Sequence, residues 1–283
     1  MTGSDKRQFD DPRWCEAQYN NRQLVKNAQD FVDRWPKQAA ETRSRLRHDA
    51  DVPYGPHARE TMDIFRADNA RGLLVFVHGG YWRTLSKAEF SWVAERFVEA
   101  GYTVALVNYP LCPEVTIRDI ATSTEKAVTK IWSLASARER ESFVVAGHSA
   151  GGYLVAHLFT VDWTRYGMPS TPFAGGISIS GLFELAPLVN ASMNEQLRLT
   201  PETAAAWSLD RVEPRVQARL ILAPGAEESS EFVRQSVDQA KRWPGVSGPA
   251  DIIEGRNHFD IVDDLTDPSS RLFGLTMRLL DGA

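Results

Sequence analysis

A serine in a glycine-rich segment is the strongest chemical signal in the sequence. Residues 147–151 read Gly-His-Ser-Ala-Gly and place Ser149 between two glycines. An apolar run at 143–146, predicted to be a strand, precedes this segment, and a predicted helix begins near Gly151. A strand that turns abruptly into a helix can hold a serine on a strained turn only if its neighbours are small. We therefore predict that Ser149 is a nucleophile; the alternative is a glycine-rich packing turn.

A serine hydroxyl is a weak nucleophile at neutral pH and needs a neighbouring base, usually a histidine. Of the six histidines, only His157 and His258 follow Ser149, and hydrolases that carry this turn place the histidine last in chain order. His157 lies within the helix predicted after Ser149, whereas His258 lies in a loop after an apolar run at 250–253. We predict His258 as the general base; the alternative is a surface histidine.

The base needs a carboxylate that orients it, and the position between serine and histidine in chain order favours the loop after the predicted strand 219–223. Glu227 and Glu228 both follow this strand. A Gly-x-x-acid turn favours Glu228, and Glu227 remains the alternative. Asp260 and Asp263 come after His258, so we expect them to be solvated or to cap a helix.

Acyl transfer also needs amide groups that stabilise a negatively charged oxygen. The amide of Ala150, directly after the nucleophile, is one candidate. Residues 78–82 read His-Gly-Gly-Tyr-Trp and follow a continuous apolar run. Gly79 and Gly80 would let this backbone turn its amides toward the serine, with Gly80 and Tyr81 as the expected donors. The alternative is an ordinary glycine turn.

These residues must be positioned by an alternation of strands and helices. Strands are predicted at 61–65, 73–77, 102–107, 143–146, 175–180, 219–223 and 250–253, and helices at 87–100, 117–135, 151–161, 231–242 and 269–280. Such alternation predicts an α/β fold with a mostly parallel central sheet flanked by helices. The chemistry of such sheets collects at the carboxyl ends of the strands.

Two segments depart from this alternation. Residues 1–58 are predicted to form a helical extension, with one helix from Asp11-Pro12 to about Asp33 and a polar, irregular stretch after Pro36. Residues 182–210 read as short helical pieces without a strand, which predicts a lid inserted between two strands. No internal repeat or low-complexity linker divides the chain, so we expect residues 1–283 to form a single domain.

Composition narrows the possible partners. The chain has 283 residues and a formal net charge of −5, and it contains no lysine/arginine block, which argues against nucleic acids and anionic membranes as partners. Its longest purely apolar run, 73–77, is far shorter than the roughly 20 residues that span a bilayer. The first ten residues have no apolar core behind their charges, so we predict no secretory signal and a cytoplasmic location.

The sequence contains no spacing of cysteines or histidines that is typical of a redox or metal site. Cys15 and Cys112 lie far apart without a CxxC spacing and are expected to be free thiols. No metal-ligand spacing is apparent, because His148 and His157 are nine residues apart rather than at i, i+4. We expect no metal, no cofactor and a small-molecule substrate; both a monomer and a homodimer are compatible with the sequence.

The two glycine-rich segments together resemble the α/β-hydrolase superfamily, and specifically its kynurenine formamidase (arylformamidase) group, which carries HGGxW. Further similar segments are Tyr19-Asn20 and the runs beginning at Tyr109, Ser180, Glu231 and Asn257. The resemblance places the nucleophile on Ser149, the base on His258 and the acid on Glu228, where the family usually has aspartate.

The resemblance implies a cofactor-free hydrolase that removes a small acyl group, formyl in the best-known members, from an aromatic amine. Tyr81, Trp82, Phe183 and Trp207 are candidates for the wall of an aromatic pocket; the alternative is that they belong to the core. The residues by themselves predict only acyl hydrolysis. A carboxylesterase for short acyl esters and a non-catalytic ligand-binding protein on a hydrolase fold are therefore the competing hypotheses.

Overall fold

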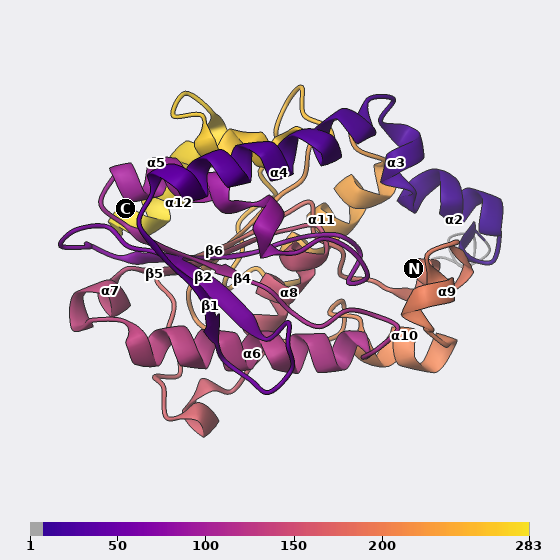
Figure 1. Cartoon of the computed structure of the whole chain (residues 1–283). Coiled ribbons are helices and arrows are strands. Elements are labelled where there is room, and N and C mark those ends of the chain that lie inside the picture. Colours follow the sequence, from indigo (N-terminus) through magenta and orange to yellow (C-terminus); the bar gives the residue numbers. More distant parts are fainter. Residues whose placement is uncertain (1–7, 283) are drawn as a thin grey trace.

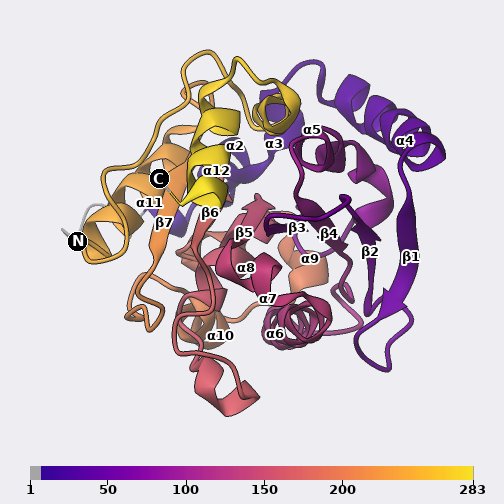
Figure 2. The ribbon, with the colours of Figure 1, turned by 90° about the vertical axis from the view of Figure 1, so that its left-hand side faces the viewer.

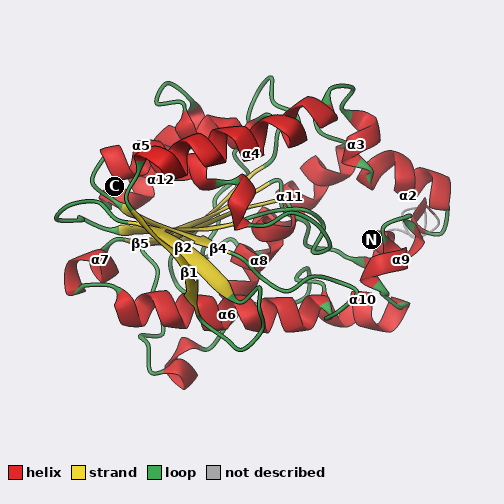
Figure 3. Cartoon of the chain, viewed as in Figure 1, coloured by secondary structure: helices red, strands yellow, loops and turns green. Residues whose placement is uncertain are grey.

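The computed structural model describes residues 8–282. The segment 1–7, on which the prediction about a secretory signal rests, lies outside the described residues. A seven-stranded sheet crosses the molecule with helices on both faces (Figures 1 and 3). The strands are β1 His48–Pro53, β2 Thr61–Phe65, β3 Leu73–Val77, β4 Thr103–Val107, β5 Phe143–His148, β6 Gly175–Ile179 and β7 Arg219–Ala223. The predicted α/β architecture is confirmed.

The sheet is parallel from β4 to β7, in the order β1-β2-β4-β3-β5-β6-β7, and antiparallel where β2 joins β1 and β4. The register aligns the carboxyl ends of the central strands: Val77 pairs with Gly147, and Ile179 pairs with both His148 and Ala223. The loops that follow β3, β5, β6 and β7 therefore begin side by side at one edge. All the predicted catalytic residues lie in these loops or in the segment that follows β7.

Two hydrophobic cores lie on the two faces of the sheet because successive side chains of a strand point to opposite sides. On β3, Leu74 and Phe76 enter one core, and Val75 and Val77 enter the other. Figure 2 shows the two helical layers that cover these faces. One layer contains α4 Ala28–Arg45, α5 Ala94–Glu99 and α12 Arg271–Asp281; the other contains α6 Ile117–Leu134, α7 Ala137–Glu141, α8 Ala150–Leu158 and α11 Ser230–Arg242.

The N-terminal extension differs from its prediction. It forms α2 Pro12–Tyr19, α3 Asn21–Leu24 and α4, which continues through Pro36 to Arg45, and it is followed by the edge strand β1 rather than by irregular chain. The prediction of an irregular stretch after Pro36 was wrong because an apolar stripe with helical spacing continues past the proline. The buried members of this stripe are Ala28, Phe31, Trp35, Ala39 and Thr42.

Two other predicted elements, a strand and a helix, are less regular in the structure than the sequence predicts. The expected strand at 250–253 makes a single bridge, between Gly225 and Ile253, and so extends beside the end of β7 without a ladder. Pro224 interrupts the pairing there because proline has no amide hydrogen to donate. The expected helix at 87–100 consists of two 3₁₀ turns, η1 Lys87–Glu89 and η2 Ser91–Val93, followed by the short α5.

Between β6 and β7 the chain forms short helical pieces, as the sequence predicts. They are η4 Ala186–Asn190, α9 Asn194–Leu197 and α10 Pro201–Trp207, and two further 3₁₀ turns lie elsewhere, η3 Trp163–Tyr166 and η5 Ile261–Thr266. In Figure 1, α9 and α10 lie at the same end of the molecule as α2. Within residues 8–282, no helix combines the length and the apolar character that crossing a bilayer requires.

Candidate active site

Ser149 occupies a tight turn between β5 and α8. Its φ angle is +56°, a conformation that costs a non-glycine residue on the order of 1–3 kcal/mol. The amide of Ser149 donates to the carbonyl oxygen of Ile179 at 2.8 Å, which ties the turn to β6. A Cβ atom at Gly151 would lie 2.0 Å from the carbonyl oxygen of Val77. Only glycine therefore lets the first turn of α8 approach β3 this closely.

His258 lies between Ser149 and Glu228. Its Nε2 is 3.0 Å from Oγ of Ser149, and its Nδ1 is 2.6 Å from Oε2 of Glu228. A carboxylate can only accept a hydrogen bond, so Nδ1 carries the proton and Nε2 presents a lone pair to the serine hydroxyl. The side chains of His258 and Glu228 are 6% and 0% exposed. The structure thus brings these three residues together, although Glu228 follows Ser149 by 79 positions and His258 follows Glu228 by 30.

The turn after β7 decides which glutamate contacts the histidine. Glu228 folds back on Gly225, whose amide donates to Oε1 of Glu228 at 2.6 Å. The hydroxyl of Ser180 donates to the same oxygen at 2.5 Å. Glu227 is exposed, and its amide donates to the carbonyl oxygen of Arg256. Glu228, and not Glu227, is therefore the carboxylate that holds His258.

A second histidine, missed as a site residue in the sequence, supports the loop that carries the first. Nε2 of His148 lies 2.9 Å from the carbonyl oxygen of His258 and donates to it. Burial, and then the nearby His258, hold the pKa of His148 well below its usual value, so its ring is neutral. The only sequence signal for this role is its position directly before Ser149.

The remaining candidates for the base and the acid are engaged elsewhere. His157, in the last turn of α8, pairs with Glu125 at 2.8 Å. Asp260 accepts the amide hydrogen of Asn257 and so closes the loop that carries His258. Asp263 is bound by Arg34 of α4. Among the described residues, none of these three candidates makes a hydrogen bond with Ser149.

The loop after β3 lies directly against the nucleophile. A Cβ atom at Gly79 would be 3.1 Å from Cβ of Ser149. Gly80 and Tyr81 both have positive φ angles, +107° and +49°, so the backbone reverses direction here. Among residues 8–282, no acceptor is found for the amides of Gly80, Tyr81 or Ala150. They remain candidates for stabilising an oxyanion, as predicted from the sequence.

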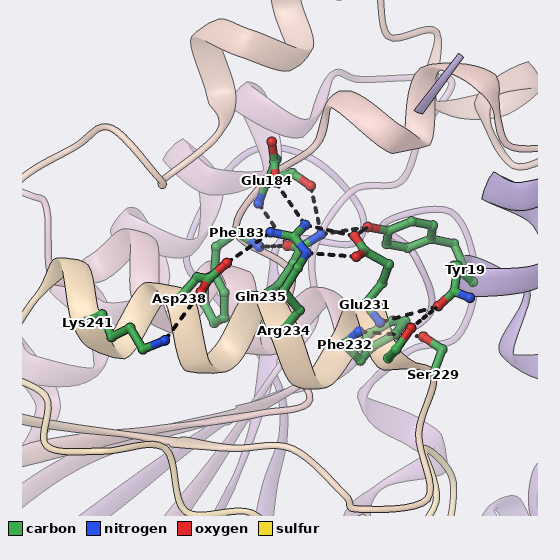
Figure 4. A network of polar contacts seen from close by, with 12 residues as sticks. Tyr19, Phe183, Glu184, Ser229, Glu231, Phe232, Arg234, Gln235, Asp238 and Lys241 are labelled. Carbon is green, nitrogen blue, oxygen red and sulfur yellow. Dashed lines mark hydrogen bonds and ion pairs between the residues drawn. The ribbon is translucent and has the colours of Figure 1, made fainter. Parts of the chain in front are cut away.

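The hydroxyl of Tyr81 anchors this loop to the N-terminal extension. It donates to the carbonyl oxygen of Tyr19 at 2.5 Å, and the hydroxyl of Tyr19 donates to Glu231 at 2.7 Å. Figure 4 shows the continuation of this network along α11, where Arg234 joins Glu231 to Glu184. Burial raises the pKa of Glu184. Side chains from the N-terminal extension, the segment between β6 and β7, and α11 thus form one largely buried polar network beside the site.

A cavity of about 210 Å³ opens onto Ser149 and His258. It is lined by aromatic and apolar side chains, by polar side chains and by the loop after β3. The lining residues are Asn20, Asn21, Arg22, Val32, Trp35, Gly80, Tyr81, Arg83, Thr84, Leu85, His148, Ser149, Ser192, Met193, His258 and Phe259.

Three of the four predicted pocket aromatics do not line this cavity. Trp82 is fully buried and packs edge-on against Tyr153, with 5.3 Å between ring centroids. Phe183 is a core residue, and Trp207 lines a separate cavity. Tyr81 alone of the four lies at the site, because the next side chain of its loop turns into the core.

The aromatic wall comes instead from segments far away in the sequence. Trp35 of α4 stacks on Phe259, the residue after His258, with 6.1 Å between ring centroids. Phe259 belongs to the run that begins at Asn257, but Trp35 belongs to no motif, so the sequence offers no signal for the wall as a whole other than the apolar stripe of α4. Within residues 8–282, no group of three or more His, Cys, Asp or Glu side chains is arranged to hold a metal ion.

Comparison with known proteins places this geometry in context. A family model described as alpha/beta hydrolase fold matches residues 74–247. The kynurenine formamidases of Salmo salar and Danio rerio are each 28% identical to this chain, over 242 and 240 residues, and each alignment covers 81% of both proteins. A solved structure from Silicibacter sp. TM1040, provisionally described as a thioesterase, is 31% identical with a TM-score of 0.82 and covers 92% of this chain and 97% of that one.

Proposed function

The chain belongs to the alpha/beta hydrolase fold family, and from this premise we propose that it is a serine hydrolase that removes a formyl or similarly small acyl group from an aryl amide. The observation that carries the proposal is the position of His258, 3.0 Å from the hydroxyl of Ser149 and 2.6 Å from the carboxylate of Glu228. Similarity to kynurenine formamidases over 81% of the chain supports the amide substrate.

In the first half of the reaction, Oγ of Ser149 attacks the acyl carbon while Nε2 of His258 takes the hydroxyl proton. Amides of Ala150 and of the Gly80-Tyr81 segment receive the negative charge on the carbonyl oxygen. When the C–N bond breaks, the same proton passes from His258 to the leaving nitrogen. The products of this half are the free aryl amine and an acyl ester of Ser149.

In the second half, water attacks the ester carbon and gives a proton to Nε2 of His258. The C–O bond to Ser149 then breaks, and His258 returns the proton to Oγ of the serine. The net reaction consumes one amide and one water and releases one amine and one carboxylic acid, which is formic acid for a formyl substrate. All proton transfers use one imidazole nitrogen.

Glu228 keeps that nitrogen available. Its Oε2 holds the Nδ1 proton and stabilises the imidazolium that forms in each half-reaction. The other oxygen is fixed by Gly225 and Ser180. These two donors hold the longer glutamate arm in a position where the resembled family usually has aspartate.

Hydrolysis of short esters or thioesters is the second candidate function. The similar structure described provisionally as a thioesterase favours it, because that relative is 31% identical over nearly its whole length. A ligand-binding protein without catalysis is less well supported, since every group that acyl transfer needs has a candidate here. The cytoplasmic location remains a prediction, and both a monomer and a homodimer remain compatible with the sequence.

A kinetic panel separates these candidates. Formanilides, acetanilides, p-nitrophenyl acetate and a short acyl thioester would be compared by kcat/KM, with Ser149→Ala as the blank. The proposal expects formanilides to be the best substrates by about tenfold or more, a difference of roughly 1.4 kcal/mol in transition-state binding. A preference for the ester or thioester would replace the proposal with the second candidate. Failure of all substrates, with Ser149 unlabelled by a fluorophosphonate, would favour a non-catalytic protein.

A further inference from the structure

Two adjacent glycines give the loop after β3 its close approach to the nucleophile but little rigidity. A Cβ atom at Gly79 would lie 3.1 Å from Cβ of Ser149, and Gly80 has a φ angle of +107°. Glycine adopts positive and negative φ angles almost equally readily, so the peptide unit between two glycines can turn over with little steric resistance. Another group is therefore needed to fix the direction in which the amide of Gly80 points.

The hydroxyl of Tyr109 binds this peptide from the protein interior. Tyr109 follows the end of β4 by two positions, is 0% exposed, and donates to the carbonyl oxygens of His78 and Gly79 at 2.9 and 3.1 Å. The C=O and N–H groups of a trans peptide lie in one plane and point in opposite directions. The carbonyl of Gly79 points toward Tyr109, so the amide of Gly80 points away from it. Gly80 lines the cavity that opens onto Ser149.

His78 binds the same carbonyl. Its Nδ1 lies 2.7 Å from the carbonyl oxygen of Gly79, which can only accept a hydrogen bond, so Nδ1 carries the proton. The rings of His78 and Tyr109 stack almost parallel, with 4.2 Å between centroids. Burial lowers the pKa of His78 to about 3 and raises the pKa of Tyr109, so both donors are neutral. The carbonyl of Gly79 thus accepts from two rings that pack against each other.

Arg59 fixes the backbone of Tyr109 in turn. Its Nε donates to the carbonyl oxygen of Tyr109 at 2.8 Å. Its Nη2 donates to the carbonyl oxygen of Leu85 at 2.7 Å and to Oδ1 of Asn108 at 3.0 Å. Leu85 lies in the loop after β3, and Asn108 begins the loop after β4. One side chain therefore joins the two loops, and Tyr109 is held through both its backbone and its ring.

We propose that Tyr109 is a positioning residue for acyl transfer, because its hydroxyl holds the carbonyl of Gly79 and so keeps the amide of Gly80 directed into the cavity at Ser149. The tyrosine does not line this cavity, so it acts through the peptide and not on the substrate itself. The inference rests on the proposed function only in that an oxyanion must form, which is common to amides, esters and thioesters. The substrate oxygen gains its charge in the transition state, so the effect belongs to kcat.

The kinetic test is Tyr109→Phe, which removes the hydroxyl and keeps the stacked ring. Loss of a whole oxyanion donor costs about 10²- to 10³-fold in kcat. Because His78 still binds the carbonyl of Gly79, we expect kcat on the best substrate to fall by about 10- to 100-fold, with KM changed less than about twofold. The midpoint of the pH profile should not move, since His258 and Glu228 are untouched. A wild-type kcat, or a change confined to KM, would overturn the inference.

Tyr54→Phe is the matched control. The hydroxyl of Tyr54 also donates to a backbone carbonyl, that of Asn108, which directly precedes Tyr109 but lies outside the loop after β3. This variant should keep kcat within about twofold of wild type, because no oxyanion donor depends on that hydroxyl. If it reproduced the loss seen in Tyr109→Phe, the effect would come from packing of the loop after β4, and the positioning role would be rejected. Thermal unfolding verifies that both variants fold.

An aryl trifluoromethyl ketone tests the oxyanion contact directly. Oγ of Ser149 bonds to the ketone carbon, the carbonyl π electrons move to oxygen as an oxyanion, and the serine proton passes to His258. In Tyr109→Phe the affinity for this ketone should fall by about the same factor as kcat, whereas the affinity for the aniline product should stay within about twofold. Equal losses for the ketone and the aniline would indicate a general disturbance of the cavity and would overturn the inference.

A crystal structure of Tyr109→Phe separates failure of the inference from failure of the proposed function. If wild type hydrolyses no substrate of the panel and does not bind the ketone, the proposed function fails, and the peptide between Gly79 and Gly80 still decides the positioning role. A peptide that is turned, or that occupies two orientations, supports this role. A single orientation identical to that of wild type rejects it.

Discussion

A histidine paired with a glutamate lies near each end of helix α8, one contributed by a distant loop and the other by the helix itself. At its start, His258 meets Glu228 at 2.6 Å and Ser149 at 3.0 Å. At its end, His157 meets Glu125 at 2.8 Å, and Tyr166 donates to the other oxygen of Glu125. The two pairs are similar in residue type and in distance, yet only the first has the surroundings of a reactive site.

The difference lies in what surrounds each imidazole. Glu228 is hydrogen-bonded to Nδ1 of His258, which leaves Nε2 free to face the serine. Glu125 is instead hydrogen-bonded to Nε2 of His157. At the first pair, free amides at the start of α8 and in the loop after β3 provide positive charge. At the second pair, the helix ends in carbonyl groups, which repel an anion. A His–Glu pair therefore becomes useful for acyl transfer only beside a strained serine and free amides.

The largest expected effect comes from removing the serine that distinguishes the first pair. Ser149→Ala should lower kcat by about 10⁴-fold or more on any substrate the protein hydrolyses, because covalent catalysis is lost. Steady-state kinetics, together with loss of fluorophosphonate labelling, would measure this. If the variant kept wild-type activity, Ser149 would not be the nucleophile, and the pair of His258 and Glu228 would have no catalytic advantage over the pair of His157 and Glu125.

A smaller but still large effect should separate the two adjacent glutamates. Glu228→Gln would favour the wrong histidine tautomer and should lower kcat by about 10²- to 10⁴-fold. The exposed Glu227→Gln is the matched control and should stay within about twofold of wild type, as expected for a surface substitution. Equal losses in the two variants would mean that the observed contact with His258 has no catalytic role.

Stability against acid should report on the buried histidines near the first pair. Burial lowers the pKa of His78 to about 3, and burial and then His258 lower the pKa of His148. Both rings take up a proton near pH 6.5 once unfolded, so the free energy of unfolding should fall as the pH drops below 6.5, by about 1.4 kcal/mol per pH unit for each histidine. Above pH 6.5 both states are neutral, and this contribution is constant.

Urea unfolding at pH 7, 6 and 5 would measure this slope. In His148→Gln, whose amide can still donate to the carbonyl of His258, the slope should be smaller by up to the contribution of one histidine. An unchanged slope in this variant would contradict the assignment of His148 as a neutral buried ring.

The smallest effect on activity is expected at the second pair. His157→Gln should leave kcat and KM unchanged, because the residue contacts neither Ser149 nor the cavity that opens onto it. It should lower the free energy of unfolding by about 1–3 kcal/mol, since it weakens a hydrogen bond to the largely buried carboxylate of Glu125. A large loss of kcat with an unchanged melting temperature would reveal a function at this end of α8.

Much of the fold follows from local patterns in the sequence. The apolar runs of β3 and β5 and the small residues around Ser149 act within a few positions of one another, so their spacing predicts a strand, a turn and a helix. Chain order then limited the choice of histidine to two. The extension was less predictable, because Pro36 suggested an end to a helix whose buried stripe continues on both sides of it.

The sequence by itself determined the α/β alternation and the candidate residues Ser149, His258 and Glu228. The sequence did not identify most of the side chains that line the cavity. Trp35, Asn21 and Arg83 reach the site from α4, α3 and the loop after β3, and no spacing rule connects them to Phe259 or to Ser149. Only the tertiary structure decided which side chains face the nucleophile, because that depends on how helices pack over the sheet edge, and packing involves contacts between residues that are distant in the chain.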